Sequence, residues 1–388
     1  MIPREYVGKE QAFVKHRLLE TYLKKLFMIV GQRQDLTSYV DCFAGPWTEE
    51  SEELEGTSIS LSLRIMQDCA AALEKMGRKV RFRALYIEKD RTAYGRLETY
   101  LRARDFGVEI TSLNGDFYYL REKIMEWAGT NGFAFFFIDP FGWKNIVEPE
   151  TLRPLFQRQN SEYLVNFMLD FLRRTTGIEV HGSDMNKVFG NIQHIDDLSA
   201  REKEKVLVRQ YRENLKAAFP VSGQPPWSVT LPILYPDKDR TLYHLVYLTR
   251  HPLGIVKFME ASEASDIIQR QVRLVTKQDR RVKASGQEEL FGALEVTPVG
   301  GPKVEPEDVR RYWLSKLSIS PKRFGIRELA EMQEETGWFE SDFQAAFGSL
   351  LQEGKVRNMD DDEKTRRRTK FVHFTANHNE GEGLIKVI

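Results

Sequence analysis

Short apolar runs alternate with helix-like segments along the first part of the chain, and this alternation restricts the possible folds most. The expected strands are Tyr39–Phe43, Phe82–Ile87, Val108–Leu113, Phe133–Ile138 and Tyr163–Met168. Between them lie Ser58–Met76, Arg91–Arg104 and Tyr118–Trp127, each long enough for two or more helical turns, and an amphipathic helix is expected at residues 10–30. Strands that alternate with helices at this spacing indicate βαβ units and a parallel sheet.

Two further apolar runs predict a different kind of strand pairing. WSVTLPILY and TLYHLVYLT are separated only by PDKDR, and such a short, turn-rich link favours an antiparallel hairpin. A dinucleotide-binding dehydrogenase would continue with a parallel sixth strand instead. We therefore predict a doubly wound, Rossmann-like α/β domain at residues 1–283, with a mostly parallel sheet, a terminal antiparallel hairpin and a helical insert at about residues 170–219.

The rest of the chain predicts a second, smaller domain. Residues 284–303 are rich in Gly, Pro and small side chains, which is typical of a linker. Helical patterns follow at residues 305–317, 325–336 and 340–353, and then an apparent hairpin of GKVRNMD and TKFVHF. Three short helices and a β-ribbon resemble a winged helix, which we expect at residues 304–388.

Composition excludes several classes of protein. The chain has 388 residues, 57 Lys and Arg against 57 Asp and Glu, and two cysteines. Two cysteines exclude a disulfide scaffold and a cysteine-rich metal site, and no metal is expected. No segment has the length and apolarity of a signal peptide or a membrane span. We therefore expect a cytoplasmic protein without a membrane partner, in which any nucleic acid meets a local basic patch.

The first candidate site residues follow the first expected strand. Asp41, Phe43, Ala44 and Gly45 stand in the segment DCFAGP. Glycine lets the backbone approach a ligand closely, and Asp41 can order the loop or accept a hydrogen bond from an ammonium group. An ordinary strand-to-loop turn is the alternative. The segment lacks the GxGxxG pattern of nicotinamide-binding proteins.

Acidic residues also follow the second and third expected strands. Glu88 can accept both ribose hydroxyls of an adenosine, because a carboxylate offers two acceptor oxygens. Asp90 suits the N-cap of the next helix. Asp116 can accept an adenine amino group while Phe117 packs on the ring, although a helix-capping turn explains Asp116 equally well.

The sharpest signal follows FAFFF. Asp139, Pro140, Phe141 and Gly142 end this apolar run, where an acid is costly unless it is paired or lies at a site. Proline forces an extended turn that directs backbone carbonyls into the cleft. Asp139 and the Pro140 carbonyl can accept the N–H bonds of a planar amine that stacks on Phe141. We favour this role over a structural turn.

These residues together resemble class I methyltransferases, whose amine-modifying members end the fourth strand in an acid or amide followed by Pro-Pro-aromatic. Phe141 here replaces the second proline, and D-P-F-G is similar to the motif of tRNA guanine-N2 dimethyltransferases. Overall the chain is most similar to the three-Cys-motif partner protein family (TcmP). The matching positions are Lys15-His16, Tyr39–Pro46, Gly56–Ser58, Ile87-Glu88 and Ile138–Gly142, with Trp47 and Ser58 as departures from a glycine and a proline. The resemblance implies S-adenosylmethionine as cofactor and a radical-SAM-like partner that bears three cysteines.

Basic residues between the expected last strands predict contact with nucleic acid. Lys364, Arg366, Arg367, Arg368 and Lys370 would bind phosphates, and the alternative is a solvated turn beside Asp360–Glu363. The basic stretch Arg270–Lys283 would extend this surface. In the linker, Gln287–Phe291 is similar to peptides that dock on bacterial sliding clamps, and such short matches often arise by chance.

Two functions follow from these residues. In the first, the chain binds S-adenosylmethionine through Asp41–Gly45, Glu88 and Asp116 and transfers its methyl group to a nucleobase amine of DNA or RNA held by Asp139–Gly142. In the second, it is a catalytically silent nucleic-acid-recognition partner of the radical-SAM-like protein.

Overall fold

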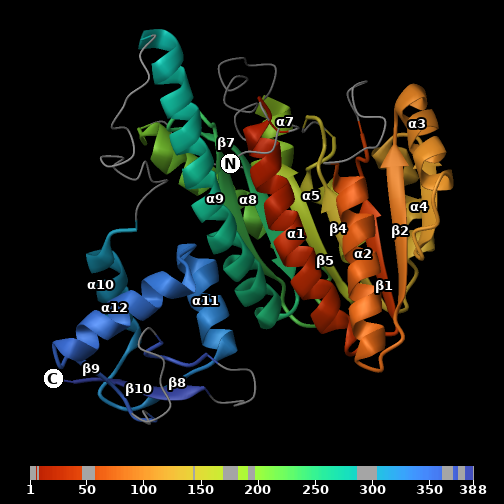
Figure 1. The fold of residues 1–388 in the computed structure, drawn as a ribbon. Coiled ribbons are helices and arrows are strands. Elements are labelled where there is room, and N and C mark those ends of the chain that lie inside the picture. The colour runs from red at the N-terminus through yellow and green to blue at the C-terminus, as the bar shows by residue number, and fades with distance from the viewer. Residues whose placement is uncertain are drawn as a thin grey trace.

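The largest element of the computed structural model is a seven-stranded sheet (Figure 1). The structure describes residue 6 and residues 8–45, 57–142, 145–168, 182–190, 197–285, 304–360, 370–374 and 381–387. The strands are β1 (Leu36–Asp41), β2 (Arg81–Glu88), β3 (Glu109–Asn114), β4 (Phe133–Ile138), β5 (Ser161–Phe167), β6 (Trp227–Leu234) and β7 (Thr241–Thr249). Their order is β3-β2-β1-β4-β5-β7-β6.

The pairing of these strands confirms the predicted parallel sheet and terminal hairpin. β1 to β5 pair in parallel, whereas β7 runs antiparallel to both β5 and β6. All six residues of β4 are buried, as expected for an apolar strand at the centre of a sheet covered on both faces. The mixed α/β class and the mostly parallel sheet are therefore as the sequence predicts.

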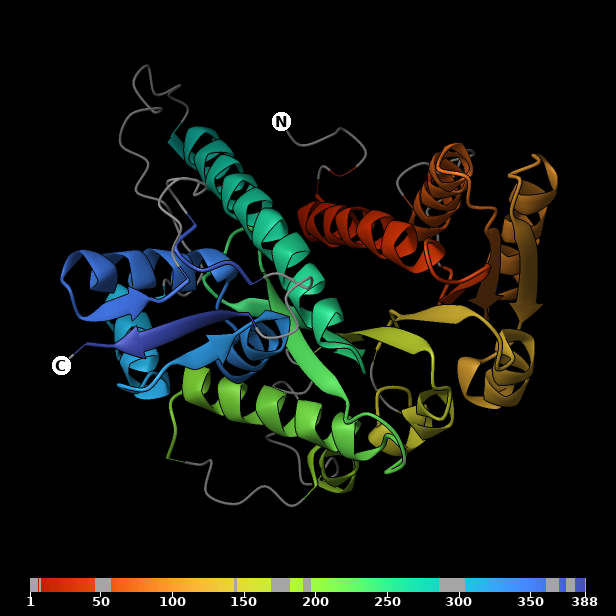
Figure 2. The same cartoon turned by 90° about the horizontal axis from the view of Figure 1, so that it is seen from below.

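Helices cover both faces of the sheet (Figure 2). The core on one face joins the sheet to α1 (Glu10–Gly31), α2 (Ser58–Lys75), α3 (Arg91–Arg102) and α9 (Pro252–Ser285). The core on the other face joins it to α4 (Phe117–Ala128), α5 (Pro149–Phe156), α7 (Gly182–Phe189) and α8 (Ala200–Ala217). Among the described helices, none is long and apolar enough to cross a membrane.

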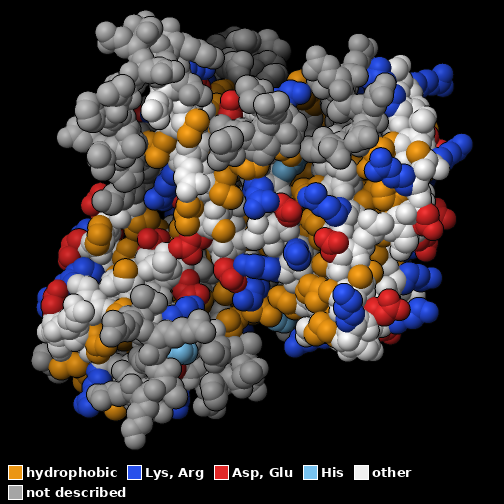
Figure 3. Space-filling view, viewed as in Figure 1, with side chains coloured by type: hydrophobic (Ala, Val, Ile, Leu, Met, Phe, Trp, Pro, Cys, Tyr) orange, Lys and Arg blue, Asp and Glu red, His pale blue; other side chains and the backbone are white. Residues whose placement is uncertain are grey.

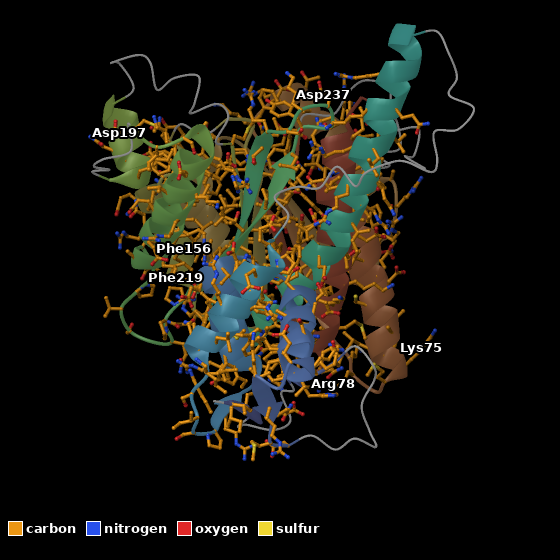
Figure 4. All side chains as sticks on the ribbon, turned by 90° about the vertical axis from the view of Figure 1, so that its left-hand side faces the viewer. Lys75, Arg78, Phe156, Asp197, Phe219 and Asp237 are labelled. Carbon is orange, nitrogen blue, oxygen red and sulfur yellow. The ribbon has the colours of Figure 1, made fainter. Side chains whose placement is uncertain are left out.

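Helix α5 is an element that the sequence pattern does not predict. It has only eight residues, with Pro149 in its first turn and Pro154 inside it, so its propensity is poor. Burial compensates: Phe156 stacks on Phe219 with ring centroids 4.3 Å apart (Figure 4). Tertiary packing therefore makes a helix where local preference does not.

The C-terminal unit contains three helices and a small sheet. The helices are α10 (Pro306–Lys316), α11 (Ile326–Thr336) and α12 (Glu340–Gln352), and the strands are β8 (Lys322–Phe324), β9 (Val356–Asn358) and β10 (Glu382–Lys386). The sheet is antiparallel in the order β8-β10-β9. The three helices match the predicted ranges within about two residues, and residues 286–303 of the expected linker lie outside the described residues.

The predicted hairpin of GKVRNMD with TKFVHF is wrong. β9 pairs with β10, and residues 370–374 form no strand. Gln344 of α12 explains the difference, because its Oε1 accepts the backbone N–H groups of Phe371 and Val372 at 2.8 and 3.1 Å. Its Nε2 donates to the Val372 carbonyl at 2.6 Å. The Gln344 side chain thus forms hydrogen bonds with backbone groups that would otherwise pair with a neighbouring strand.

Side chains also cap the outer edge of β6, the last strand of the large sheet. Gln269 of α9 accepts from the Leu234 N–H at 2.8 Å and donates to the Pro232 carbonyl at 3.3 Å. Glu334 of α11 accepts from the Ser228 N–H at 2.8 Å and from Lys216 of α8 at 3.0 Å. The C-terminal unit therefore contacts the first unit at this edge.

Candidate active site

Four polar side chains lie in a row across the carboxyl end of the sheet. They are Glu88 on β2, Asp41 on β1, Asp139 directly after β4 and Asn166 on β5, and they are called the polar row below. Two positions before each of them stand Tyr86, Tyr39, Phe137 and Leu164, which all belong to the core that faces α1 and α2. Since side chains alternate along a strand, the whole polar row faces the same side.

The loop after β1 meets Glu88, so two sequence-predicted elements come together. The Ala44 N–H donates to the Ile87 carbonyl at 2.8 Å. A Cβ added at Gly45 would collide with Oε2 of Glu88, so a larger residue there would have to displace the Glu88 carboxyl group. The other Glu88 oxygen accepts from the Asp90 N–H at 2.6 Å, and burial raises the Glu88 pKa.

Asp41 is fully buried at the centre of the polar row. Ser58 Oγ donates to its carboxyl at 2.7 Å, and the Phe43 N–H donates at 3.2 Å. Burial raises the pKa of Asp41 to about 6; the two hydrogen bonds oppose this rise, and the nearby Asp139 adds to it. The pKa of Asp41 therefore lies close to neutral pH, and a cationic ligand beside it would favour its ionised form.

Replacing Asp41 with asparagine should remove a pH-dependent loss of stability. Because the pKa of Asp41 is higher in the folded than in the unfolded state, folding favours the protonated carboxyl group. The stability that this preference contributes is complete below about pH 4 and is lost as pH rises through about 6. Between pH 4 and pH 8 the unfolding free energy of the wild type should fall relative to Asp41→Asn by on the order of 3 kcal/mol. Urea unfolding across this range measures it, with exposed Asp35→Asn as control. A constant difference between wild type and Asp41→Asn would contradict this assignment.

Asp139 is held by two side chains that sequence reasoning did not place at the site. Lys15 of α1 forms an ion pair with Oδ2, and Asn166 Nδ2 donates to Oδ1 at 2.6 Å. Asn166 is a single amide inside the apolar run YLVNF, and a polar residue there was the available signal. Lys15 stands in the predicted Lys-His motif, but its contact with Asp139 depends on how α1 packs.

The residues after Asp139 differ in exposure. Pro140 is buried, whereas Phe141 is 93% exposed. Gly142 has φ +124°, a conformation that other L-residues rarely adopt. The turn thus presents an aromatic face to solvent beside the polar row.

Asp116 and Phe117 follow β3 beside the β2 end of the polar row, where the Gly115 N–H donates to the Glu88 carbonyl at 3.0 Å. Asp116 caps α4 by accepting from the Tyr118 N–H at 2.9 Å, and its other oxygen accepts from Lys89 at 2.7 Å. Burial opposes these bonds, yet they lower the Asp116 pKa overall. Phe117 is 2% exposed in the opposite core, where its ring centroid lies 5.1 Å from that of Phe43. Asp90 caps α3 as predicted, accepting from the Ala93 N–H at 2.8 Å.

The predicted nucleic-acid surface is mostly outside the described residues. Lys364, Arg366, Arg367 and Arg368 lie there, as does the clamp-like segment Gln287–Phe291. Lys370 is described, and it pairs with Glu340 at 2.7 Å. On α9, Arg273 and Lys277 pair with Asp239, and Arg280 pairs with Asp237 in the β6–β7 turn (Figure 4). Among the described residues, no three potential ligands cluster as a metal site would require.

Comparison with known proteins gives distant structural neighbours. No protein-family model and no curated protein matches the chain. An O-methyltransferase from Bacillus cereus in complex with SAH is 14% identical, covers 59% of this chain and 79% of its own, and has a TM-score of 0.33. A putative O-methyltransferase from Klebsiella pneumoniae is 12% identical, covers 64% of this chain and 91% of its own, and has a TM-score of 0.32. Loganic acid methyltransferase with SAH is 10% identical, covers 69% of this chain and 88% of its own, and has a TM-score of 0.25.

Proposed function

We propose that the chain binds S-adenosylmethionine and methylates a nucleobase amine of DNA or RNA. The observation that carries the proposal is the contact between Gly45 and Glu88 at one end of the polar row, with Asp139 on the same face. The row holds three carboxyl groups, and Lys15 is the cation paired with them among the described residues. A site with this excess of acids fits a ligand with sulfonium and ammonium charges.

Each part of the row has a distinct task in this proposal. Glu88 accepts the ribose hydroxyls, and Gly45 brings the loop after β1 against its carboxyl group. Asp41 faces the cationic portion, where burial strengthens the attraction. The cofactor supplies an electrophilic methyl group. Asp139 and the Pro140 carbonyl would hold the acceptor nitrogen with its lone pair directed at this methyl group, and the proton that the nitrogen loses would pass to water.

Calorimetry with S-adenosylmethionine and S-adenosylhomocysteine tests the first step. We expect saturable binding in the micromolar range, because the site combines a charged pair of acceptors with a glycine-lined loop. Boiled protein is the control for heats of dilution. No binding at millimolar ligand would overturn the proposal.

The nucleic-acid part of the proposal rests on the C-terminal unit. Its order of helix, strand, two helices and two strands resembles that of a winged helix. Helix α12 contains no Lys or Arg, so phosphate contacts would come from the basic segment at residues 364–370. In Figure 3, acidic and basic side chains are interspersed over the described part of the visible face. A local basic segment therefore suits this chain better than a broad basic surface.

A catalytically silent role remains the second proposal. As in TcmP proteins, the chain would serve a radical-SAM-like protein as its nucleic-acid-recognition partner. The observation that favours this role is that both Asp139 oxygens already bind a side chain, one Lys15 and the other Asn166. Binding of S-adenosylmethionine without methyl transfer to any nucleic acid would support it.

A further inference from the structure

Asn166 has a buried oxygen that receives no hydrogen bond from the described residues. The side chain is 5% exposed, and its Oδ1 has no partner within the described part of the chain. The orientation of the amide is fixed chemically: Asp139 Oδ1 can only accept, so the group 2.6 Å from it must be Nδ2. A buried acceptor left unpaired costs about 1–3 kcal/mol, so such atoms usually have a partner in the working molecule.

The position of this oxygen indicates which ligand it serves. Along the polar row, Glu88 is on β2, Asp41 on β1, Asp139 after β4 and Asn166 on β5. Asn166 is therefore separated from Glu88 by three strand spacings, about 14 Å. It lies next to Asp139, at the end of the row away from the proposed ribose contact. The donor that reaches Asn166 thus belongs to the methyl acceptor.

We infer that Asn166 binds the methyl acceptor and selects a primary amino group. This inference rests on the proposed function. Asp139 has lone pairs left after its bonds with Lys15 and Asn166, because a carboxylate has about four acceptor positions. One N–H of an –NH2 group donates to Asp139 and the other to Asn166 Oδ1. A hydroxyl or a secondary amine has only one hydrogen and leaves one acceptor unpaired, so the pair of acceptors discriminates against both.

The surroundings of Asn166 make an aspartate at this position informative. Among the described residues, Lys15 on α1, Asp41 on β1 and Tyr243 on β7 interact electrostatically with Asp139, the partner of Asn166, and the pKa of Tyr243 is raised by burial and further by Asp139. In Asn166→Asp, two neighbouring carboxyl groups share one proton at low pH. The protonated oxygen then donates to Asp139 and the carbonyl oxygen accepts, as in asparagine. At high pH both groups ionise and repel each other.

The test measures binding of single-stranded oligonucleotides at saturating S-adenosylhomocysteine by fluorescence anisotropy. One probe contains adenine, cytosine and guanine, and the other is oligo-thymine, which has no exocyclic amino group; each is used as DNA and as its RNA equivalent. The wild type should prefer the amine-containing probe roughly tenfold. Asn166→Leu should lose this preference at every pH, and Asn166→Asp should retain it at low pH and lose it at high pH. S-adenosylhomocysteine affinity should stay within about twofold in both variants.

The outcomes separate the inference from the proposed function. If the wild type binds neither S-adenosylhomocysteine nor any oligonucleotide, the proposed function fails. If the wild type binds and discriminates but both variants discriminate equally at all pH values, Asn166 does not contact the amine. A loss of S-adenosylhomocysteine affinity in Asn166→Leu would also overturn the inference, by placing Asn166 at the cofactor. Asn160→Leu, at an exposed position just before the amino end of β5, should behave as the wild type.

Discussion

Replacing Arg158 with methionine should lower the unfolding free energy by about 3–5 kcal/mol, because it removes a buried guanidinium that donates to five backbone carbonyls. Arg158 is 4% exposed, and its guanidinium donates to the carbonyls of Ala128, Gly129, Asn131, Gly132 and Asn160. These carbonyls belong to the segments that enter β4 and β5. Arg158 thus binds the backbone at the amino end of the two strands that carry Asp139 and Asn166, with Arg83 as a second donor to the Ala128 carbonyl and Asn160 as a second donor to the Gly132 carbonyl.

Urea unfolding measures this effect as a shift of the midpoint at unchanged slope. Arg153→Met is the matched control: Arg153 is exposed on α5 and pairs with Glu150 at 2.8 Å, so its loss should change stability by less than about 0.5 kcal/mol. A loss of less than about 1 kcal/mol in Arg158→Met would mean that water replaces the guanidinium easily.

Replacing Glu88 with methionine should weaken S-adenosylhomocysteine binding at least about 100-fold. Two hydroxyl hydrogen bonds to a carboxylate contribute about 1.5–3 kcal/mol each, and each 1.4 kcal/mol corresponds to a tenfold change. Folding should not suffer, because burial already disfavours the charged form of Glu88 and raises its pKa. Calorimetry measures the affinity, and thermal unfolding checks the fold.

A ligand variant makes this prediction specific for the ribose. The 2′-deoxy analogue of S-adenosylhomocysteine should bind the wild type about tenfold more weakly than the parent compound, whereas Glu88→Met should not distinguish the two. Glu109→Gln, an exposed acid at the amino end of β3, is the control and should leave both affinities unchanged. Binding by Glu88→Met within threefold of the wild type would remove Glu88 from the cofactor site.

The sequence predicts the large sheet well because its signals are long. Phe133–Ile138 matches β4 at both ends, and the turn-rich link PDKDR predicts the antiparallel pairing of β6 and β7. Short elements fail for the converse reason. β8 has three residues, too few for a pattern. β9 lies within the predicted strand GKVRNMD, but its partner is β10 and not TKFVHF.

The sequence likewise predicts some residues of the candidate site and not others. Glu88, Asp41 and Asp139 could be predicted to converge, because the carboxyl ends of parallel strands share one edge. Lys15 could not be placed beside Asp139 from spacing alone, because the contact spans 124 positions and depends on the packing of α1 on the sheet. Asn166 lies within an apolar run whose pattern indicates only a buried strand.

The capped edge of β6 has a consequence for how such a chain can evolve. An uncovered edge strand can pair with another copy of the chain. Here the Ser228 N–H is covered by Glu334, a residue of the C-terminal unit. A protein that lost this unit would expose the edge of β6 to aggregation unless another residue covered it first. This contact therefore gives a reason, separate from any ligand of the C-terminal unit, for the two units to be retained together.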